Sequence, residues 1–237
     1  MDLKETDILG DDISQHWYYQ SKTQAMMRLL NGIQPSTILD IGAGSGFFSR
    51  YLLENSSAHD AWCVDIGYDK DYDTLEQGKA VHFRRSINQV DADLILLMDV
   101  LEHVEDDAAL LSLYVNKVPR GARFLISVPT FQFLWSEHDV FLEHKRRYNL
   151  HQIEDVARCA GLTVIQGSYY FGLVFPLAAA IRIASRLFAD NNPPRSQLSK
   201  HHPLVNITLA SLCRLELPFM RLNRLAGLTF FCLAQKG

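Results

Sequence analysis

Ile38-Leu39-Asp40-Ile41-Gly42-Ala43-Gly44-Ser45-Gly46 is an apolar strand that runs into a glycine-rich turn, and a helical stretch follows it. Glycines allow a tight turn and a close approach of the backbone to a ligand, and the N-terminus of a helix offers N–H groups to it. A glycine turn can also be purely structural, so its surroundings decide between the two interpretations. Strand, turn and helix together predict an α/β fold.

Two carboxylates flank this turn. Asp40 lies in the strand before the glycines, and Asp65 closes the next strand about 20 residues beyond them, the spacing at which a carboxylate receives ribose hydroxyls. The GxGxG spacing differs from the GxGxxG of dinucleotide-binding turns. A carboxylate at Asp40 also repels phosphate but suits the cationic amino group of a methionine moiety. The surroundings of the turn therefore argue against a dinucleotide.

Apolar runs alternate with helix-like stretches along the chain, which predicts βα units around a mostly parallel sheet. We expect strands at Thr37–Ile41, Ala61–Asp65, Val81–Arg84, Asp93–Met98, Arg123–Val128, Thr163–Tyr170 and Leu228–Ala234. We expect helices near 14–31, 45–54, 104–117 and 150–160. Gly121 and Gly161 each stand just before a strand, where a left-handed helix cap is needed.

The connection to the last strand is far longer than a hairpin needs. Two apolar helical stretches fill it, at about 173–188 and 204–225, and the breaker Asp190-Asn191-Asn192-Pro193-Pro194-Arg195-Ser196 separates them. The chain is thus predicted to have four parts. These are an N-terminal helical cover at 1–36, a cofactor-binding core at 37–170, an inserted helical subdomain at 171–227 and the last core strand at 228–237.

Composition narrows the class of protein. Hydrophobic residues make up 48% of the 237 residues and charged residues 21%, which suits a packed core. The polar, acidic start is unlike a signal peptide, and the four scattered cysteines predict neither disulfides nor a zinc site, so we expect a cytoplasmic protein. Residues 176–237 hold eight Lys/Arg and two Asp/Glu, but they are strongly apolar, so no nucleic-acid partner is expected.

These features resemble the class I S-adenosylmethionine-dependent methyltransferases over about residues 14–170 and again at the last strand. Leu39–Gly46 is similar to their first motif, Asp65 to their ribose-binding acid, and Asp99-Val100-Leu101-Glu102-His103-Val104 to the segment after their fourth strand. The resemblance implies a Rossmann-like seven-stranded sheet of order 3-2-1-4-5-7-6, with the last strand antiparallel and helices on both faces. It implies S-adenosylmethionine as cofactor, bound by Asp40, Gly42, Ala43, Gly44, Gly46, Asp65, Ile66, Asp99 and Val100.

His16-Trp17-Tyr18-Tyr19-Gln20-Ser21-Lys22 resembles an N-terminal His-Trp-Trp-Phe-x-x-Arg segment of a bacterial branch of these enzymes, in which a helix covers the cofactor. The resemblance implies that Trp17 and Lys22 contact the cofactor. Lys22 stands in place of the arginine. The ammonium group of lysine is a point charge, whereas the guanidinium of arginine donates two parallel hydrogen bonds, so we expect a carboxylate to be held less firmly. The aromatic residues can equally serve to pack the helix onto the core.

A dense polar block follows the fifth strand, at the edge where ligands bind in open α/β sheets. Val128–Asp139 and His144-Lys145-Arg146-Arg147-Tyr148 resemble the Pro-Ala-x-x-x-Leu-Trp-Ser-x-His-Asp…His-x-Arg-Arg-Tyr block of the same branch. Methyl transfer to a hydroxyl requires alignment and removal of a proton. His138 is the first candidate for the base, oriented by Asp139 or Glu102, and His144 is the second.

The acceptor is expected to contact Glu102, His103, Trp135, Arg146, Arg147 and Tyr148. The two arginines can hold an anionic group bidentately, or they can be ion pairs with Glu137 or Glu143. His138 and Asp139 can instead form a helix cap. No metal site is predicted, because no second cluster completes a ligand set with His138, His144 and Asp139.

The inserted helices carry basic residues among bulky apolar ones. Phe171–Ile181 is apolar, but Arg182 and Arg186 interrupt it before a membrane-spanning length. The second stretch places Arg214, Arg221 and Arg224 among apolar residues. This pattern fits contact of 171–225 with the inner membrane face, a lid over the core, or a homodimer interface. All three arrangements are compatible with a hydrophobic acceptor.

The sequence therefore predicts an S-adenosylmethionine-dependent O-methyltransferase. Its acceptor is a small molecule or lipid-linked compound of hydrophobic, glycan or quinone-like character. One rival is an NAD- or nucleotide-sugar-dependent enzyme, against which stands the absence of GxGxxG and of a Tyr-x-x-x-Lys pair. The other is a non-catalytic cofactor-binding or interaction protein.

Overall fold

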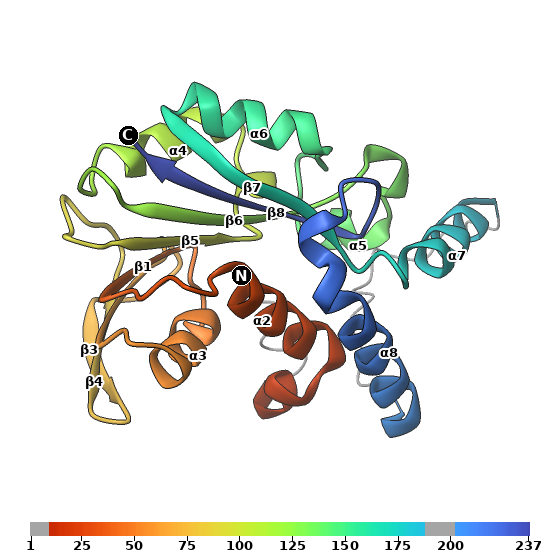
Figure 1. Ribbon diagram of the computed structural model, residues 1–237, viewed down its shortest axis with the longest axis horizontal. Coiled ribbons are helices and arrows are strands. Elements are labelled where there is room, and N and C mark those ends of the chain that lie inside the picture. Colours follow the sequence, from red (N-terminus) through yellow and green to blue (C-terminus); the bar gives the residue numbers. More distant parts are fainter. Residues whose placement is uncertain (1–9, 188–201) are drawn as a thin grey trace.

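The fold is an eight-stranded mixed sheet with helices on both faces (Figure 1), seen in a computed structural model that describes residues 10–187 and 202–237. The strand order is β3-β4-β2-β1-β5-β6-β8-β7. The strands are β1 Thr37–Ile41, β2 Asp60–Val64, β3 Tyr72–Glu76, β4 Lys79–Arg84, β5 Leu94–Met98, β6 Arg123–Pro129, β7 Leu162–Tyr170 and β8 Thr229–Lys236. All seven predicted strands are present, within one or two residues of the predicted bounds.

The predicted count of seven strands is wrong, because β3 forms an antiparallel hairpin with β4 at the edge of the sheet. The observed order thus differs from the expected one by this added strand. The hairpin turn is Gln77-Gly78, and both residues have positive φ, 50° and 80°, as a two-residue turn of this kind requires. The expected antiparallel last strand is confirmed, since β8 pairs antiparallel with both β6 and β7.

Helices cover both faces because the central strands are buried on both sides. Neighbouring residues of a strand point to opposite faces, so Ile38 joins one hydrophobic core and Leu39 the other. The first core lies under α2 (Trp17–Leu29) and α3 (Phe47–Asn55), and the second under α4 (Asp107–Val115) and α6 (Leu150–Cys159) (Figure 1). Short helices η1 (Gly10–Gln15), η2 (Leu101–His103), η3 (Gln132–Leu134) and α5 (Glu137–Phe141) complete the core region.

Between β7 and β8 the chain forms α7 (Phe175–Leu187), α8 (Pro203–Glu216) and η4 (Leu217–Leu222), which lie at one end of the molecule (Figure 1). The predicted breaker at 190–196 falls outside the described residues, as does the side chain of Arg186. Asn206 of α8 joins the N-terminal segment: its Oδ1 accepts from the N–H of Trp17 at 2.8 Å, and its Nδ2 donates to the carbonyl of Gln15 at 2.9 Å. Within the described ranges, no helix is both long and apolar enough to span a bilayer.

Candidate active site

The glycine turn after β1 is packed too closely to accept side chains. Gly42, Gly44 and Gly46 all have positive φ, at 65°, 54° and 73°. A Cβ on Gly42 would lie 2.7 Å from Cγ2 of Val100, well inside contact distance. The N–H of Gly42 donates to the carbonyl of Val64 at 2.7 Å, which ties the turn to the end of β2. Glycine is thus required here, and a ligand can approach the backbone.

Two carboxylates hold this turn from different sides. Oδ2 of Asp65 accepts from the N–H of Gly44 at 3.0 Å, and Asp65 remains partly exposed at the carboxyl end of β2. Asp40 is 1% exposed and accepts from Oγ of Ser49 on α3 at 2.6 Å. Burial raises the pKa of Asp40 to about 6, against the lowering effect of the Ser49 hydrogen bond. Asp40 therefore lies beneath the turn, and Asp65 beside it.

The N-terminal helix is fixed to the sheet by an ion pair between Lys22 of α2 and Asp99, which follows β5. Burial alone would lower the pKa of Lys22 and raise that of Asp99, but their mutual attraction outweighs burial and moves both pKa values the opposite way. Oγ of Ser127 donates to the other oxygen of Asp99 at 3.0 Å. Asp99 has a φ of 57°, an unusual conformation for a residue other than glycine. Lys22 thus pairs with a carboxylate of the chain itself, and its expected contact with the cofactor stays a prediction.

These positions fit S-adenosylmethionine, whose sulfonium and amino groups are positively charged. Asp40, Asp65 and Asp99 stand at the carboxyl ends of three adjacent strands, β1, β2 and β5, beside the glycine turn. Ala43 is buried in the turn, whereas Ile66 is 85% exposed at its rim. A site with three carboxylates and exposed backbone suits a cationic nucleoside better than a pyrophosphate.

Next to this edge lies a cavity of about 510 Å³ that runs between the end of the sheet and the helices α7 and α8. Trp17 and Asp99, both expected at the cofactor, belong to its lining, so the cavity adjoins the predicted cofactor site. The other lining residues are Tyr18, Glu102, His103, Pro129, His138, Leu142, His144, Arg147, Val174, Leu177, Ala178, Ile181, Arg182, Leu209, Leu228 and Thr229. We call this the acceptor cavity.

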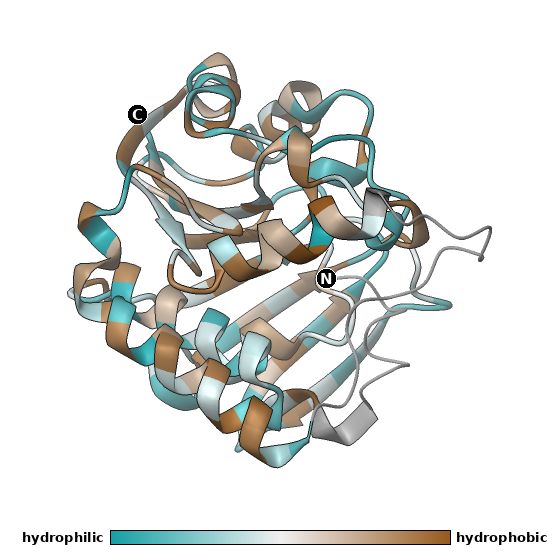
Figure 2. Cartoon of the chain, turned by 90° about the vertical axis from the view of Figure 1, so that its right-hand side faces the viewer, coloured by the Kyte–Doolittle hydropathy of each residue, from teal (hydrophilic) through white to brown (hydrophobic). Residues whose placement is uncertain are grey.

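One side of the acceptor cavity is apolar; the sequence pattern offered a lid over the core for this helix but did not identify the residues that line the cavity. Val174, Leu177, Ala178 and Ile181 follow the i, i+3, i+4, i+7 spacing that places side chains on one face of a helix. That spacing was readable in the sequence, although not the surface that the face would meet. Apolar residues continue along the helices at this end of the molecule (Figure 2).

The opposite side of the cavity is polar and centres on Asp139, which is fully buried. Arg147 donates to it bidentately, from Nε at 2.8 Å and from Nη2 at 3.0 Å, and Nδ1 of His144 lies 2.9 Å from its Oδ1. Burial raises the pKa of Asp139, but the hydrogen bond from His144 and the charge of Arg147 outweigh it and hold the pKa well below its usual range. Asp139 also accepts from the N–H of Ser136 at 2.8 Å, which caps α5.

The two candidate bases differ in their surroundings. His138 lines the cavity, and burial, assisted by Arg182, lowers its pKa to about 4, so it is neutral at neutral pH. Asp139, expected to orient His138, lies 2.9 Å from Nδ1 of His144. Glu102, the other expected partner, is buried, and burial together with Asp99 raises its pKa well above the usual range.

Three residues expected at the acceptor are outside the lining of this cavity: Trp135, Arg146 and Tyr148. Nη2 of Arg146 donates to the carbonyl of Glu105 at 2.7 Å, and the hydroxyl of Tyr148 donates to Asp107 at 2.7 Å. Arg147 does reach the cavity, but its guanidinium is engaged with Asp139. Of the expected acceptor residues, Glu102, His103 and Arg147 line the acceptor cavity, whereas Arg146 and Tyr148 line a second cavity of about 720 Å³ that Arg147 also reaches.

Comparisons with known proteins point to one class of enzyme. The profile of a family described as a methyltransferase domain matches residues 14–167. No curated protein sequence matches the chain. Among solved structures, the chain is similar to the methyltransferase in complex with the Haloferax volcanii Trm112 methyltransferase activator, with a TM-score of 0.57 and 15% identity over 99% of this chain and 94% of that one.

A second similar structure is Haemonchus contortus phosphoethanolamine N-methyltransferase 2 in complex with S-adenosyl-L-methionine. The TM-score is 0.54 and the identity 19%, over 90% of this chain and 52% of that one. The chain thus spans about half the length of that enzyme. At such identities the likeness shows a common fold.

Proposed function

Because the chain belongs to the methyltransferase domain family and is an S-adenosylmethionine-dependent methyltransferase, we propose that it methylates a hydroxyl group of a largely apolar acceptor. Membership of this family removes both rival interpretations, the NAD- or nucleotide-sugar-dependent enzyme and the non-catalytic protein. The resemblance to a bacterial branch, carried by the segments at His16–Lys22 and Val128–Tyr148, is part of the same proposal.

The shape of the acceptor cavity carries this proposal. It begins at Asp99 beside the cofactor edge and ends against the apolar face of α7, so an acceptor with one polar end and an apolar body fits its two sides. About 510 Å³ lies within the range of small-molecule pockets. Lipid-linked, quinone-like and glycan-bearing acceptors all share such a polar end, and a hydroxyl there meets Glu102 and the histidines of the polar side.

S-adenosylmethionine supplies a methyl group already activated by its sulfonium. We assign Asp65 to the ribose, Asp40 to the cationic tail, and the glycine turn to close backbone contact. Trp17 and Lys22 of α2 close the site from above, since Lys22 is anchored on Asp99. These residues bind and orient S-adenosylmethionine. Side chains on the polar side of the acceptor cavity remove the proton of the acceptor's hydroxyl.

His138 is the proposed proton acceptor. It lines the cavity and is neutral at neutral pH, because its pKa is lowered to about 4. His144, the other candidate, is held by Asp139 and thereby directed toward Glu102 and His103.

We further propose that the enzyme works at the cytoplasmic face of a membrane. Leu204, Leu215, Phe219 and Leu225 of the α8–η4 region are each more than 65% exposed, and Arg214 lies among them. Exposed apolar residues next to cations suit anionic lipid headgroups. A homodimer would cover the same surface, so vesicle sedimentation and measurement of the oligomeric state distinguish the two arrangements.

A pair of substitutions on one helix tests the assignment of the acceptor cavity. Ala178→Trp fills the cavity, whereas Ala184→Trp places the same ring on the exposed side of α7. We expect the first to abolish methyl transfer while S-adenosylmethionine still binds, and the second to leave transfer intact. Equal activity of the two variants would show that the acceptor binds elsewhere.

A further inference from the structure

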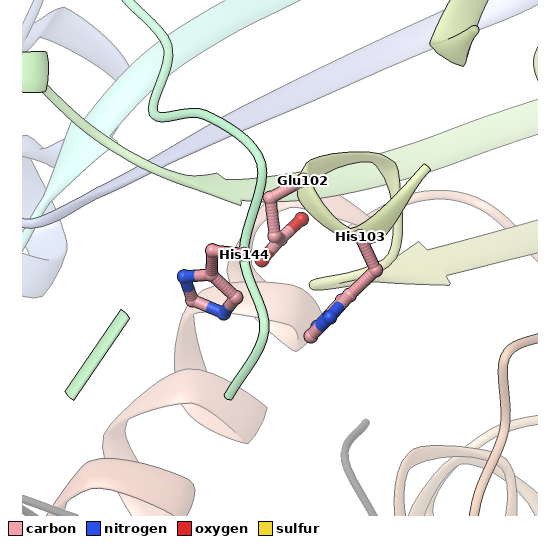
Figure 3. Close-up of side chains that lie close together, drawn as sticks. All are labelled: Glu102, His103 and His144. Carbon is pink, nitrogen blue, oxygen red and sulfur yellow. The ribbon is translucent and has the colours of Figure 1, made fainter. Parts of the chain in front are cut away.

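Three side chains that can bind a metal meet on the polar side of the acceptor cavity. Glu102 and His103 lie on η2 just after β5, and His144 follows α5, so two distant segments converge. One ligand atom from each lies within 4.8 Å of the others. Figure 3 shows the carboxylate of Glu102 between the two imidazole rings.

The buried carboxylate of Glu102 is the feature that calls for a ligand. Its side chain is 0% exposed, and neither carboxylate oxygen has a hydrogen-bond partner among the residues that the structure describes. A buried polar group without a partner costs stability, and a buried carboxylate costs most. A cation bound beside it would satisfy both oxygens.

His144 is prepared as a ligand by its neighbours. Asp139 holds its Nδ1 at 2.9 Å, and Arg147 in turn holds Asp139. Metal-binding histidines commonly give one ring nitrogen to a carboxylate, which fixes the ring and makes the other nitrogen more basic. Nε2 is then the nitrogen that remains for an ion beside Glu102.

The balance of charges around the cluster is compatible with a divalent ion. Lys22 and Arg147 are nearby cations, but Lys22 is paired with Asp99 and Arg147 with Asp139. Once an ion replaces its proton, Glu102 therefore supplies negative charge that these pairs do not cancel. Two imidazoles with one carboxylate suit zinc and other first-row transition metals, whereas magnesium prefers oxygen ligands.

We infer that Glu102, His103 and His144 form a binding site for a divalent first-row transition metal ion of the Zn²⁺ type, with an open coordination position toward the acceptor cavity. The sequence did not predict it, because the set considered there was His138, His144 and Asp139. Asp139 instead supports a ligand, and the fold brings in Glu102 and His103.

The consequence for the reaction rests on the proposed function. An ion in this position would bind the acceptor oxygen and lower the pKa of its hydroxyl. A hydroxyl acidified in this way needs only a weak base. Binding of the ion itself requires neither acceptor nor turnover.

The test is direct metal binding to full-length, tag-free protein stripped with a chelator. We expect one equivalent of Co²⁺ to give visible absorption bands of a four- or five-coordinate site, Zn²⁺ to displace it, and Mg²⁺ to have no effect. Absence of Co²⁺ and Zn²⁺ binding would overturn the inference, whatever the result of the methyl-transfer assay.

Matched variants locate the site. Glu102→Gln keeps the shape of the side chain and removes its charge, and we expect Zn²⁺ affinity to fall at least about ten-fold. His151→Ala, at an exposed histidine of α6, is the control and should leave the affinity unchanged. If Glu102→Gln does not fold, the partly exposed His103→Gln provides the same comparison. Equal affinity in the cluster and control variants would contradict the assignment.

Discussion

Replacing Asp40 with asparagine should make the ligand-free protein more stable while removing its cofactor. Asp40 is buried under the glycine turn, and burial raises its pKa from 3.8 to about 6. Each pKa unit corresponds to about 1.4 kcal/mol, so the ionised carboxylate costs the folded state about 3 kcal/mol. Asparagine carries no charge, and its side-chain oxygen can still accept from Ser49.

The pH dependence of this cost follows from the difference between the pKa values of Asp40 in the folded and unfolded states. An acid whose pKa is raised in the folded state binds its proton more tightly there than in the unfolded chain. The cost is therefore absent below about pH 4, grows as the pH rises toward 6, and is complete at about pH 7. Asp40→Asn should match the wild type near pH 4 and exceed its free energy of unfolding by up to about 3 kcal/mol near pH 7.

Urea unfolding without ligand, repeated across this pH range, measures the difference. Asp93→Asn is the control: this exposed carboxylate accepts from the N–H groups of Ser36 and Thr37 at 3.0 and 3.1 Å, so its replacement should bring no gain. Calorimetry with S-adenosylmethionine should show binding lost in Asp40→Asn. A variant that is less stable at pH 7, or that binds the cofactor with unchanged affinity, would refute the reasoning.

Three further outcomes are expected. Gly42→Ala should abolish S-adenosylmethionine binding in calorimetry, because the added Cβ would lie 2.7 Å from a side-chain atom of Val100. Gly121→Ala is the control and should bind normally: its φ is also positive, at 85°, but the nearest atom to the added Cβ is 3.9 Å away. Lys22→Met should lower the free energy of unfolding by on the order of 3 kcal/mol, because Asp99 loses its counter-charge, and Lys22→Met with Asp99→Asn should recover part of it. His138→Ala should reduce kcat by roughly 100-fold or more with cofactor affinity unchanged, and an unaltered kcat would assign the proton to another group.

Most of the sheet could be predicted because its strands are apolar runs bounded by turn residues. β3 was missed because Tyr72-Asp73-Thr74-Leu75-Glu76 is an exposed edge strand with acidic residues, which lacks that pattern. The positive φ of Gln77 in its turn is also rare for a residue other than glycine. α5 was anticipated only through the alternative of a helix cap at His138 and Asp139, since five residues are too few to show a helical period.

The acceptor side was predicted less well, because it depends on contacts between distant segments. Arg146 and Arg147 are neighbours in sequence and looked equivalent, yet only Arg147 reaches the acceptor cavity. Sequence proximity also paired Asp139 with His138, whereas the fold pairs it with His144. Spacing along the chain indicates which residue types are available, but the packing of β5, α5 and α7 decides which of them meet.

The most direct test of the central claim is transfer of an isotopically labelled methyl group from S-adenosylmethionine to matched acceptors. Each apolar acceptor would be offered with a free hydroxyl, with that oxygen blocked, and with an amine in its place, using the wild type and Ala178→Trp. The account predicts that label appears on the free hydroxyl compounds and is lost in Ala178→Trp. Label on the amines alone, or no transfer to any acceptor by a protein that binds S-adenosylmethionine, would contradict it.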